Sequence, residues 1–378
     1  MKFLHLADLH LGKRVNEYSM VEDQEYILTE ILKIVDEEKP FGVIIAGDVY
    51  DKSTPSLEAV TMLDGFLVKL NKRNVKAFIV SGNHDSPERL SFGANLMEKS
   101  GIFTAKVFNG KLQKFTFNDE YGVFNIYALP FIKPINARRY FGEDIKTYTD
   151  AVSKVIDSET LNLSERNILI THQFVTGATR SESEEISVGG SDNVDGIVFD
   201  KFDYTALGHI HKAQTVGSEY IRYSGTPLKY SFSESKHLKS VTVVDFKEKG
   251  NITIKEIPLK PLRDMVELRG YYNDLTLKSF YENTTYREDF VHITLLDEED
   301  IPDAVSKLKI IYKNLMKLDY DNLRTRSNNA VTGAEEMQSK TPIQLFGEFY
   351  ALQNNRELSV EQEKFMDKLI EEVWGEEI

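Results

Sequence analysis

Cysteine is absent from the 378 residues of this chain. Disulfides, thiolate catalysis and zinc sites with cysteine ligands are therefore excluded. Long apolar runs are absent too, since none approaches the ~20 residues that a helix needs to span a bilayer. The opening MKFLHLAD places His5 and Asp8 too early for the apolar core of a signal peptide. We therefore expect a cytoplasmic protein that does not enter the membrane.

Positive charge is in short supply, because the formal net charge is −14. Affinity for nucleic acid comes largely from neutralised phosphates, so this excess of acid argues against broad, non-specific binding. Bound divalent cations can, however, reverse the local sign of an acidic site. Net charge therefore does not exclude a phosphate-containing substrate.

Residues 1–260 alternate between short apolar runs and helical patterns, which predicts an α/β sandwich. The length and the 41% content of hydrophobic residues favour two or three domains. The expected strands are Lys2–Ala7, Phe41–Ala46, Lys76–Ser81, Asn167–Thr171, Tyr204–Leu207, Tyr220–Tyr223, Ser240–Phe246 and Ile252–Ile257. The clearest expected helices are Val21–Glu38 and Leu57–Arg73.

Two prolines, Pro258 and Pro261, indicate a boundary after this region. Residues 261–324 predict a small α+β capping domain, and the polar residues 325–342 predict a linker. The expected elements of the capping domain are the strands Met265–Leu268, Phe290–Leu296 and Lys317–Leu323 and the helix Ile301–Leu315.

Residues 343–378 predict a pair of short amphipathic helices. Ser359 and Gln362 have the spacing of a capping box at the start of the second helix. Such a pair can fold back on the catalytic domain or dock on another chain, and the linker favours docking. The residues that we expect to contact a partner are Phe346, Phe349, Tyr350, Phe365, Leu369, Val373 and Trp374.

Seven side chains able to bind metal follow strand-like runs, although the chain has only eight histidines. Each block alone could be a solvated turn or a structural histidine, but five such blocks in order are hard to explain structurally. Mixed carboxylate, amide and imidazole donors suit manganese, iron or zinc, and seven donors suit two ions that share a carboxylate. That arrangement predicts hydrolysis of a phosphoester. The seven residues are Asp8, His10, Asp48, Asn83, His172, His209 and His211.

The order of these motifs resembles that of the calcineurin-like metallophosphoesterases. FLHLADLHLGK, AGDVYD and SGNHDSPERL are more specifically similar to the SbcD and Mre-eleven type of DNA repair nuclease. The resemblance covers about residues 1–260 and implies two sheets flanked by helices. It implies one ion held by Asp8, His10, Asp48 and His211 and a second held by Asp48, Asn83, His172 and His209.

In this family pattern Asp48 bridges the two ions and His84 is the catalytic histidine. The resemblance implies that His84 stabilises the transition state or protonates the leaving oxygen. Asp51 occupies a position where archaeal relatives have a second active-site histidine, so its role stays open.

The resemblance further implies a manganese-dependent nuclease with 3′-to-5′ exonuclease activity on duplex ends and endonuclease activity on single strands and hairpins. Such nucleases are homodimers and form heterotetramers with an SMC-like ATPase of the SbcC type. The chain itself has no GxxxxGK loop for ATP. The alternatives are a phosphomonoesterase or cyclic-nucleotide phosphodiesterase on the same dimetal core, and a catalytically vestigial DNA-end scaffold.

Two further groups of residues have weaker signals. A homodimer surface and ordinary core packing are equally compatible with Leu90, Phe92, Leu96 and Met97. A set of cations is compatible with contacts to DNA or with a solvated charged surface. These cations are Lys13, Arg14, Arg89, Lys133, Arg138 and Arg139.

Overall fold

The computed structural model describes residues 1–184, 192–322, 325, 342–354 and 357–374. The predicted linker therefore lies outside the described residues except at its two ends, 325 and 342. Among the described residues, no helix has the length and apolar character to cross a bilayer.

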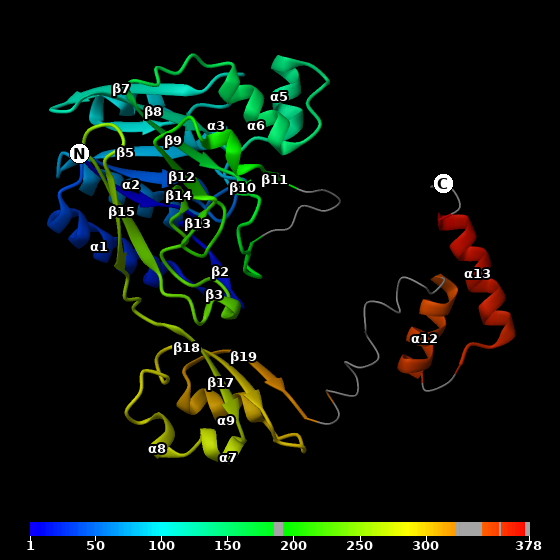
Figure 1. Ribbon diagram of the computed structural model, residues 1–378. Helices are drawn as coiled ribbons and strands as arrows, with labels where there is room; N and C mark the ends of the chain where they lie inside the picture. The colour runs from blue at the N-terminus through cyan, green and yellow to red at the C-terminus, as the bar shows by residue number, and fades with distance from the viewer. Residues whose placement is uncertain (185–191, 323–324, 326–341, 355–356, 375–378) are drawn as a thin grey trace.

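Two six-stranded sheets face each other at the centre of residues 1–258 (Figure 1). The first has the order β16-β15-β1-β4-β5-β6, with β1, β4, β5 and β6 parallel. Its strands are β1 (Lys2–Leu6), β4 (Gly42–Ala46), β5 (Lys76–Val80), β6 (Ile102–Thr104), β15 (Ser240–Phe246) and β16 (Ile252–Pro258).

The second sheet has the order β13-β14-β12-β9-β8-β7, with β8, β9, β12 and β14 parallel. The sequence analysis did not predict β7 and β8, which form a hairpin at one edge of this sheet. Exposure alternates along β7, so its apolar run is weak. Its strands are β7 (Gln113–Asp119), β8 (Gly122–Leu129), β9 (Arg166–His172), β12 (Tyr204–Gly208), β13 (Gln214–Val216) and β14 (Ser218–Tyr223).

Helices cover the outer face of each sheet, which confirms the predicted α/β sandwich. Helices α1 (Val21–Glu38) and α2 (Leu57–Asn71) pack on the first sheet, and α5 (Pro134–Phe141) and α6 (Tyr148–Asp157) pack on the second. Between the sheets lies an apolar core that includes Phe3, Phe78 and Phe124. Burial on both faces explains why these strands read as continuous apolar runs.

Short elements complete this part of the chain. Residues 87–97 form two single helical turns, α3 and α4, and Gly93 between them has φ +73°. These elements are β2 (Arg14–Val15), β3 (Tyr18–Ser19), α3 (Pro87–Leu90), α4 (Ala94–Met97), η1 (Glu98–Ser100), β10 (Phe174–Val175), β11 (Asn193–Val194), η2 (Gly196–Phe199) and η3 (Phe232–Glu234).

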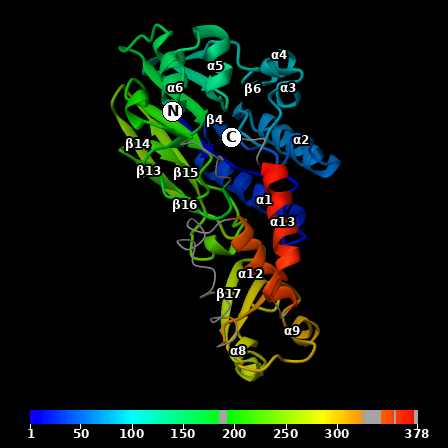
Figure 2. The same ribbon diagram turned by 90° about the vertical axis from the view of Figure 1, so that its right-hand side faces the viewer.

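A three-stranded parallel sheet, β17-β18-β19, forms a small module at one end of the molecule (Figures 1 and 2). The predicted helix Ile301–Leu315 is too long, because the observed helix runs from Ala304 to Ile311. Tyr312 leaves the helical conformation, and its hydroxyl donates to the Leu275 carbonyl at an O–O distance of 2.6 Å. The module contains β17 (Met265–Gly270), α7 (Tyr272–Leu275), α8 (Lys278–Tyr281), β18 (Phe290–Leu295), α9 (Ala304–Ile311) and β19 (Asn314–Tyr320).

The C-terminal pair consists of α12 (Pro342–Asn354) and α13 (Val360–Trp374), which stand apart from the two-sheet body in Figure 1. The predicted capping box is confirmed, because Ser359 N donates to Gln362 Oε1 at 3.0 Å and Gln362 N to Ser359 Oγ at 3.3 Å. Phe349 and Phe365 are 59% and 66% exposed. The predicted contact residues Val373 and Trp374 have side chains outside the described part of the chain.

Candidate metal centre

The predicted metal-binding residues converge where strands of both sheets end. The loops after β1 and β4 run side by side, because Asp8 N donates to Gly47 O at 3.0 Å and His10 N to Asp48 O at 2.9 Å. The loops after β9 and β12 approach from the second sheet. Residues that are 201 positions apart, such as His10 and His211, therefore meet in one buried site.

The backbone at this site is strained. Asp8, His10, Asp48 and His209 all have positive φ, between +43° and +105°. Such conformations cost about 1–3 kcal/mol each and persist where the surroundings impose them, typically at functional sites. The strain indicates that the fold holds these four side chains in particular directions at a cost in local backbone stability.

Two glycines allow the sheets to approach closely here. Gly47 has φ +87°, and a Cβ at that residue would lie 2.3 Å from His172 Nδ1. A Cβ at Gly208 would lie 1.8 Å from the Ala46 carbonyl oxygen. Any side chain at either position would push the two sheets apart.

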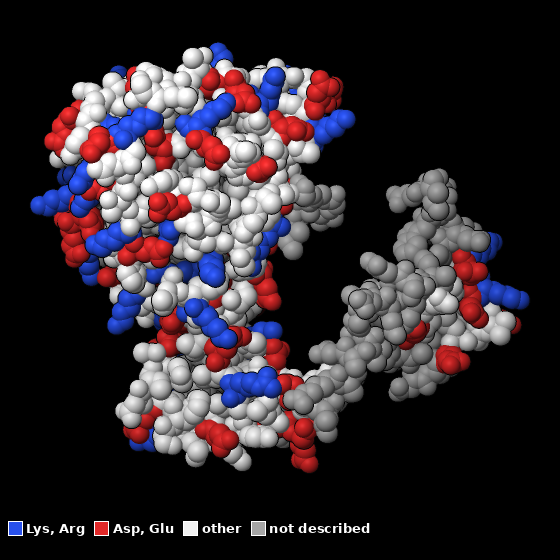
Figure 3. All heavy atoms as spheres, in the orientation of Figure 1, with Lys and Arg blue, Asp and Glu red and all other residues white. Residues whose placement is uncertain are grey.

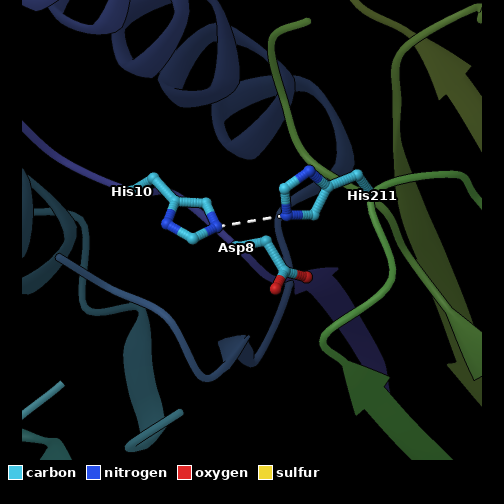
Figure 4. Close-up of side chains that lie close together, drawn as sticks. All are labelled: Asp8, His10 and His211. Atoms are coloured by element: carbon cyan, nitrogen blue, oxygen red, sulfur yellow. Dashed lines mark hydrogen bonds between the residues drawn. The ribbon is translucent and has the colours of Figure 1, made fainter. Parts of the chain in front are cut away.

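One cluster contains Asp8, His10 and His211, whose polar atoms can come within 4.8 Å of one another (Figure 4). His10 Nε2 and His211 Nε2 are 3.2 Å apart, and the Asp8 carboxylate lies close to both rings. A second cluster contains Asn83, His172 and His209. Asn83 Oδ1 is 3.0 Å from both His172 Nε2 and His209 Nδ1.

Asp48 lies between the two clusters. Its Oδ2 is 3.8 Å from His10 Nε2 on one side and 3.3 Å from His172 Nε2 on the other. His84 is directed at the same carboxylate, with its Nε2 3.9 Å from Oδ2, and its backbone N–H donates to Oδ1 at 2.9 Å. A single carboxylate oxygen thus faces donors of both clusters.

These separations fit the binding of divalent cations. Two donors that bind one ion at about 2.1 Å and at right angles are about 3 Å apart. The 3.2 Å between the His10 and His211 Nε2 atoms and the 3.0 Å from Asn83 Oδ1 to His172 Nε2 and to His209 Nδ1 are of this size. Burial lowers the pKa of His209 to about 3, and it lowers the pKa of His10 as well, so both rings are neutral and can bind a cation without first losing a proton.

The charges at the centre of the site are coupled. Burial opposes ionisation of both Asp48 and His172, but their mutual attraction is stronger. It lowers the pKa of Asp48 below its ordinary value and raises the pKa of His172 to about 9. The Asp48 carboxylate is therefore anionic, as a group shared by two cations must be.

Sequence reasoning missed the residues that hold these side chains in place. Asp85, which follows His84, accepts backbone N–H groups from Gly82, Val49 and Tyr50 and so joins the loops after β4 and β5. Its position directly after the GNH motif was a usable signal. Burial raises the pKa of Asp85 to about 6, with a further contribution from Asp48.

A buried network supports His211 from behind. Ser183 Oγ lies 2.7 Å from His211 Nδ1 and donates to Glu234 Oε1 at 2.5 Å, while Glu234 forms an ion pair with Lys239. Burial opposes ionisation of Glu234, but Lys239 and His211 lower its pKa to about 2. No local sequence pattern marks Glu234, because it reaches the site only through the fold.

The predicted DNA-contacting cations differ in their surroundings. Lys13 Nζ is 2.7 Å from Asp51, and Arg138 donates to the Ile145 carbonyl at 2.7 Å, so both have partners within the protein. The side chains of Arg14, Arg89, Lys133 and Arg139 are exposed. On the face shown in Figure 3, basic and acidic side chains are interspersed.

The residues considered for a dimer surface divide into two groups. Leu90 and Met97 pack against the core, as the alternative of ordinary packing predicts. Phe92 and Leu96 are 85% and 75% exposed. The second pair is therefore the more accessible to a partner, while Met97 is partly buried and Leu90 is buried.

Comparison with known proteins agrees with this architecture. The calcineurin-like phosphoesterase family model matches residues 1–213, and the model described as the type 5 capsule protein repressor C-terminal domain matches residues 261–354. The SbcD subunit of the nuclease SbcCD from Staphylococcus saprophyticus is 34% identical to this chain over 377 residues, which cover 98% of each protein.

Solved structures that the comparison matched include a dimetal phosphatase from Danio rerio, with 12% identity and a TM-score of 0.40 over 69% of this chain and 98% of that one. A protein of Thermus thermophilus has 11% identity and a TM-score of 0.38 over 68% of this chain and 98% of its own.

Proposed function

The chain belongs to the SbcD family of calcineurin-like phosphoesterases, and we propose that it is the manganese-dependent nuclease of a DNA repair complex. Family membership makes it a dimetal phosphodiesterase nuclease. The proposal adds 3′-to-5′ exonuclease activity on duplex ends and endonuclease activity on single strands and hairpins. It also adds the division into a nuclease domain (1–260), a capping domain (261–324), a linker (325–342) and a helical pair (343–378).

The position of Asp48 carries the proposal. Its Oδ2 faces His10 in one cluster and His172 in the other. We assign one ion to Asp8, His10, Asp48 and His211, and the second to Asp48, Asn83, His172 and His209. A shared carboxylate offsets the repulsion between two cations held close together.

The chain's own residues orient the substrate and move the proton. When bound, the two cations would polarise the scissile phosphate and activate a water. His84 lies beside Asp48, where its ring can stabilise charge on the phosphate or protonate the leaving sugar oxygen. Its Nδ1 lies 3.1 Å from the Asp51 carbonyl oxygen, which orients the ring. We therefore assign the catalytic role to His84 and a positioning role to the Asp51 backbone.

The C-terminal helices are the proposed contact with an SMC-like ATPase of the SbcC type. They expose aromatic side chains that α12 and α13 do not bury between themselves. Phe92 and Leu96 are the proposed homodimer contact, which would give a heterotetramer with two ATPase subunits. The exposed cations Arg14, Arg89, Lys133 and Arg139, together with Lys13 and Arg138, are the proposed contacts with DNA.

A cleavage assay tests the function. The protein is incubated with manganese and with duplex, single-stranded and hairpin oligonucleotides labelled at the 3′ or the 5′ end, and in parallel with a chromogenic phosphomonoester. We expect shortening of duplex strands from the 3′ end and internal cuts in single strands and hairpins. Turnover of the monoester alone would favour the phosphatase alternative, and turnover of no substrate the vestigial scaffold.

A further inference from the structure

A cavity of about 360 Å³ opens beside the metal centre. Asn83 and Asp85 form its wall on the side of the metal centre, and the loop after β8 with the start of α5 forms the opposite wall. Phe131 N donates to Ser81 O at 2.9 Å, so this loop is fastened to the loop that carries Asn83. The cavity is therefore held in a fixed place relative to the site of cleavage.

Aromatic and apolar side chains line the cavity. The Phe131 ring is nearly parallel to the His209 ring, with centroids 6.4 Å apart, so an aromatic ring of the cavity wall lies next to a residue of the metal centre. Phe108 and Tyr140 make an edge-to-face contact at 5.6 Å. Tyr140 and Ile135 are 51% and 57% exposed although they belong to a structured helix. Such exposure of large apolar side chains in a concave site is typical of ligand binding.

The charges around the cavity suit a nucleotide. Lys133 and Arg139 are exposed at the α5 wall and can contact phosphate. The acids of the cavity, Asp85 and Glu88, lie on the opposite wall, and Asp85 is buried. The volume is within the range of pockets that hold small organic ligands. Aromatic rings, cations and a neighbouring phosphate-cleaving centre together match a nucleoside with its phosphate better than a purely apolar ligand.

We propose that this cavity binds the base of an unpaired nucleotide next to the scissile phosphate. The inference rests on the proposed nuclease function and extends it to substrate choice. A base inside a duplex is stacked on its neighbours, so it must leave the stack to enter the cavity. The cavity therefore favours single strands and frayed ends over intact duplex at the cleaved position.

Abasic oligonucleotides test this assignment. A single-stranded substrate with one preferred cut is synthesised with a tetrahydrofuran residue at each position around that cut. We expect kcat/KM of the wild-type protein to fall by ~5- to 150-fold, the usual effect of one lost base stack, at one position adjacent to the cut. Tyr140→Ala should lower kcat/KM for the normal substrate and make it nearly insensitive to the abasic residue.

Two matched variants sharpen the test. Tyr140→Phe keeps the ring and should keep the sensitivity to base removal. Lys72→Ala removes an exposed cation at the C-terminal end of α2, away from the cavity, and should behave as wild type. Tyr140 packs against Gly110, so Tyr140→Ala could destabilise the protein. In that case Arg139→Ala is used instead, and Arg139→Ala should weaken binding of the normal substrate.

The outcomes separate the two proposals. If the wild-type protein with manganese cleaves no oligonucleotide, the nuclease function fails and the cavity assignment fails with it. If DNA is cleaved but every abasic position is tolerated equally, only the cavity assignment is overturned. The cavity assignment is also overturned if Tyr140→Ala and base removal together lower kcat/KM by the product of their separate effects. Changes to the two partners of one contact must instead be non-additive.

Discussion

Folded proteins usually bury apolar side chains and expose polar ones, and the metal centre and the C-terminal helices depart from this rule in opposite ways. At the metal centre, charged and polar residues such as Asp8 and His172 are fully buried. On α12 and α13, aromatic residues such as Phe349 and Phe365 are exposed. Buried polar groups need partners, and exposed apolar patches need covering. Buried donors such as these suit bound cations, and we propose that the exposed aromatic side chains suit contact with another protein.

The two regions also differ in how firmly they are built. The metal centre is joined to both sheets by backbone hydrogen bonds and accepts strained backbone at four ligand positions. Between α12 and α13, the described contacts include a hydrogen bond from the exposed Gln362 to Tyr350 at 3.2 Å. We therefore expect changes at the metal centre to affect chemistry and changes on the helices to affect assembly.

Asp48→Ala should have the largest effect on DNA cleavage. It removes the carboxylate shared by both clusters, so two cations can no longer be held together against their repulsion. We expect loss of both bound metal and cleavage, measured by elemental analysis of the purified protein and by the oligonucleotide assay. Retention of two manganese ions per chain would show that Asp48 does not bridge.

His84→Ala should lower kcat by about 100- to 10,000-fold, the usual contribution of a general acid or base, while the metal content stays nearly unchanged. In our assignment His84 is a ligand of neither ion. Elemental analysis beside single-turnover kinetics checks both parts. Equal loss of metal in His84→Ala and Asp48→Ala would mean that His84 is a ligand.

Glu234→Gln should weaken manganese binding by about 10- to 100-fold, because residues that orient a metal-binding histidine usually contribute that much. The amide keeps the size of the side chain but loses the charge that pairs with Lys239 and supports Ser183 and His211. Calorimetric titration with manganese measures the effect.

The matched control for this variant is Glu288→Gln. Glu288 and its partner Lys313 are both exposed and lie in the small module, so neutralising Glu288 should leave manganese affinity unchanged. Equal affinities for wild type and Glu234→Gln would remove the positioning role from Glu234.

Phe365→Asp should have the smallest effect on cleavage by the isolated chain and a large effect on assembly. An interfacial aromatic residue commonly contributes about 2 kcal/mol or more to binding, roughly a 30-fold change in affinity. Analytical ultracentrifugation with an SbcC-type ATPase checks it, with Lys364→Ala on the neighbouring exposed position as the control. Undiminished binding would place the partner elsewhere.

Much of the architecture was predictable because the signals are local. Helix α1 has the predicted bounds Val21–Glu38, and the capping box of Ser359 and Gln362 forms as its spacing indicates. The α/β class is also confirmed. The helix predicted to reach Leu315 was wrong, because its apolar pattern continues into β19 and only the tertiary contact of Tyr312 ends the helix.

The sequence by itself determined which donors are available and that each follows a strand, because residue type and apolar patterning are properties of short segments. Only the tertiary structure decided that Asp48 Oδ2 faces both His10 and His172, that Glu234 supports His211, and that Tyr140 lines a cavity beside Asn83. The physical reason is that these contacts join residues from different strands and loops. Their distances depend on how two sheets pack, and spacing along the chain contains no record of that packing.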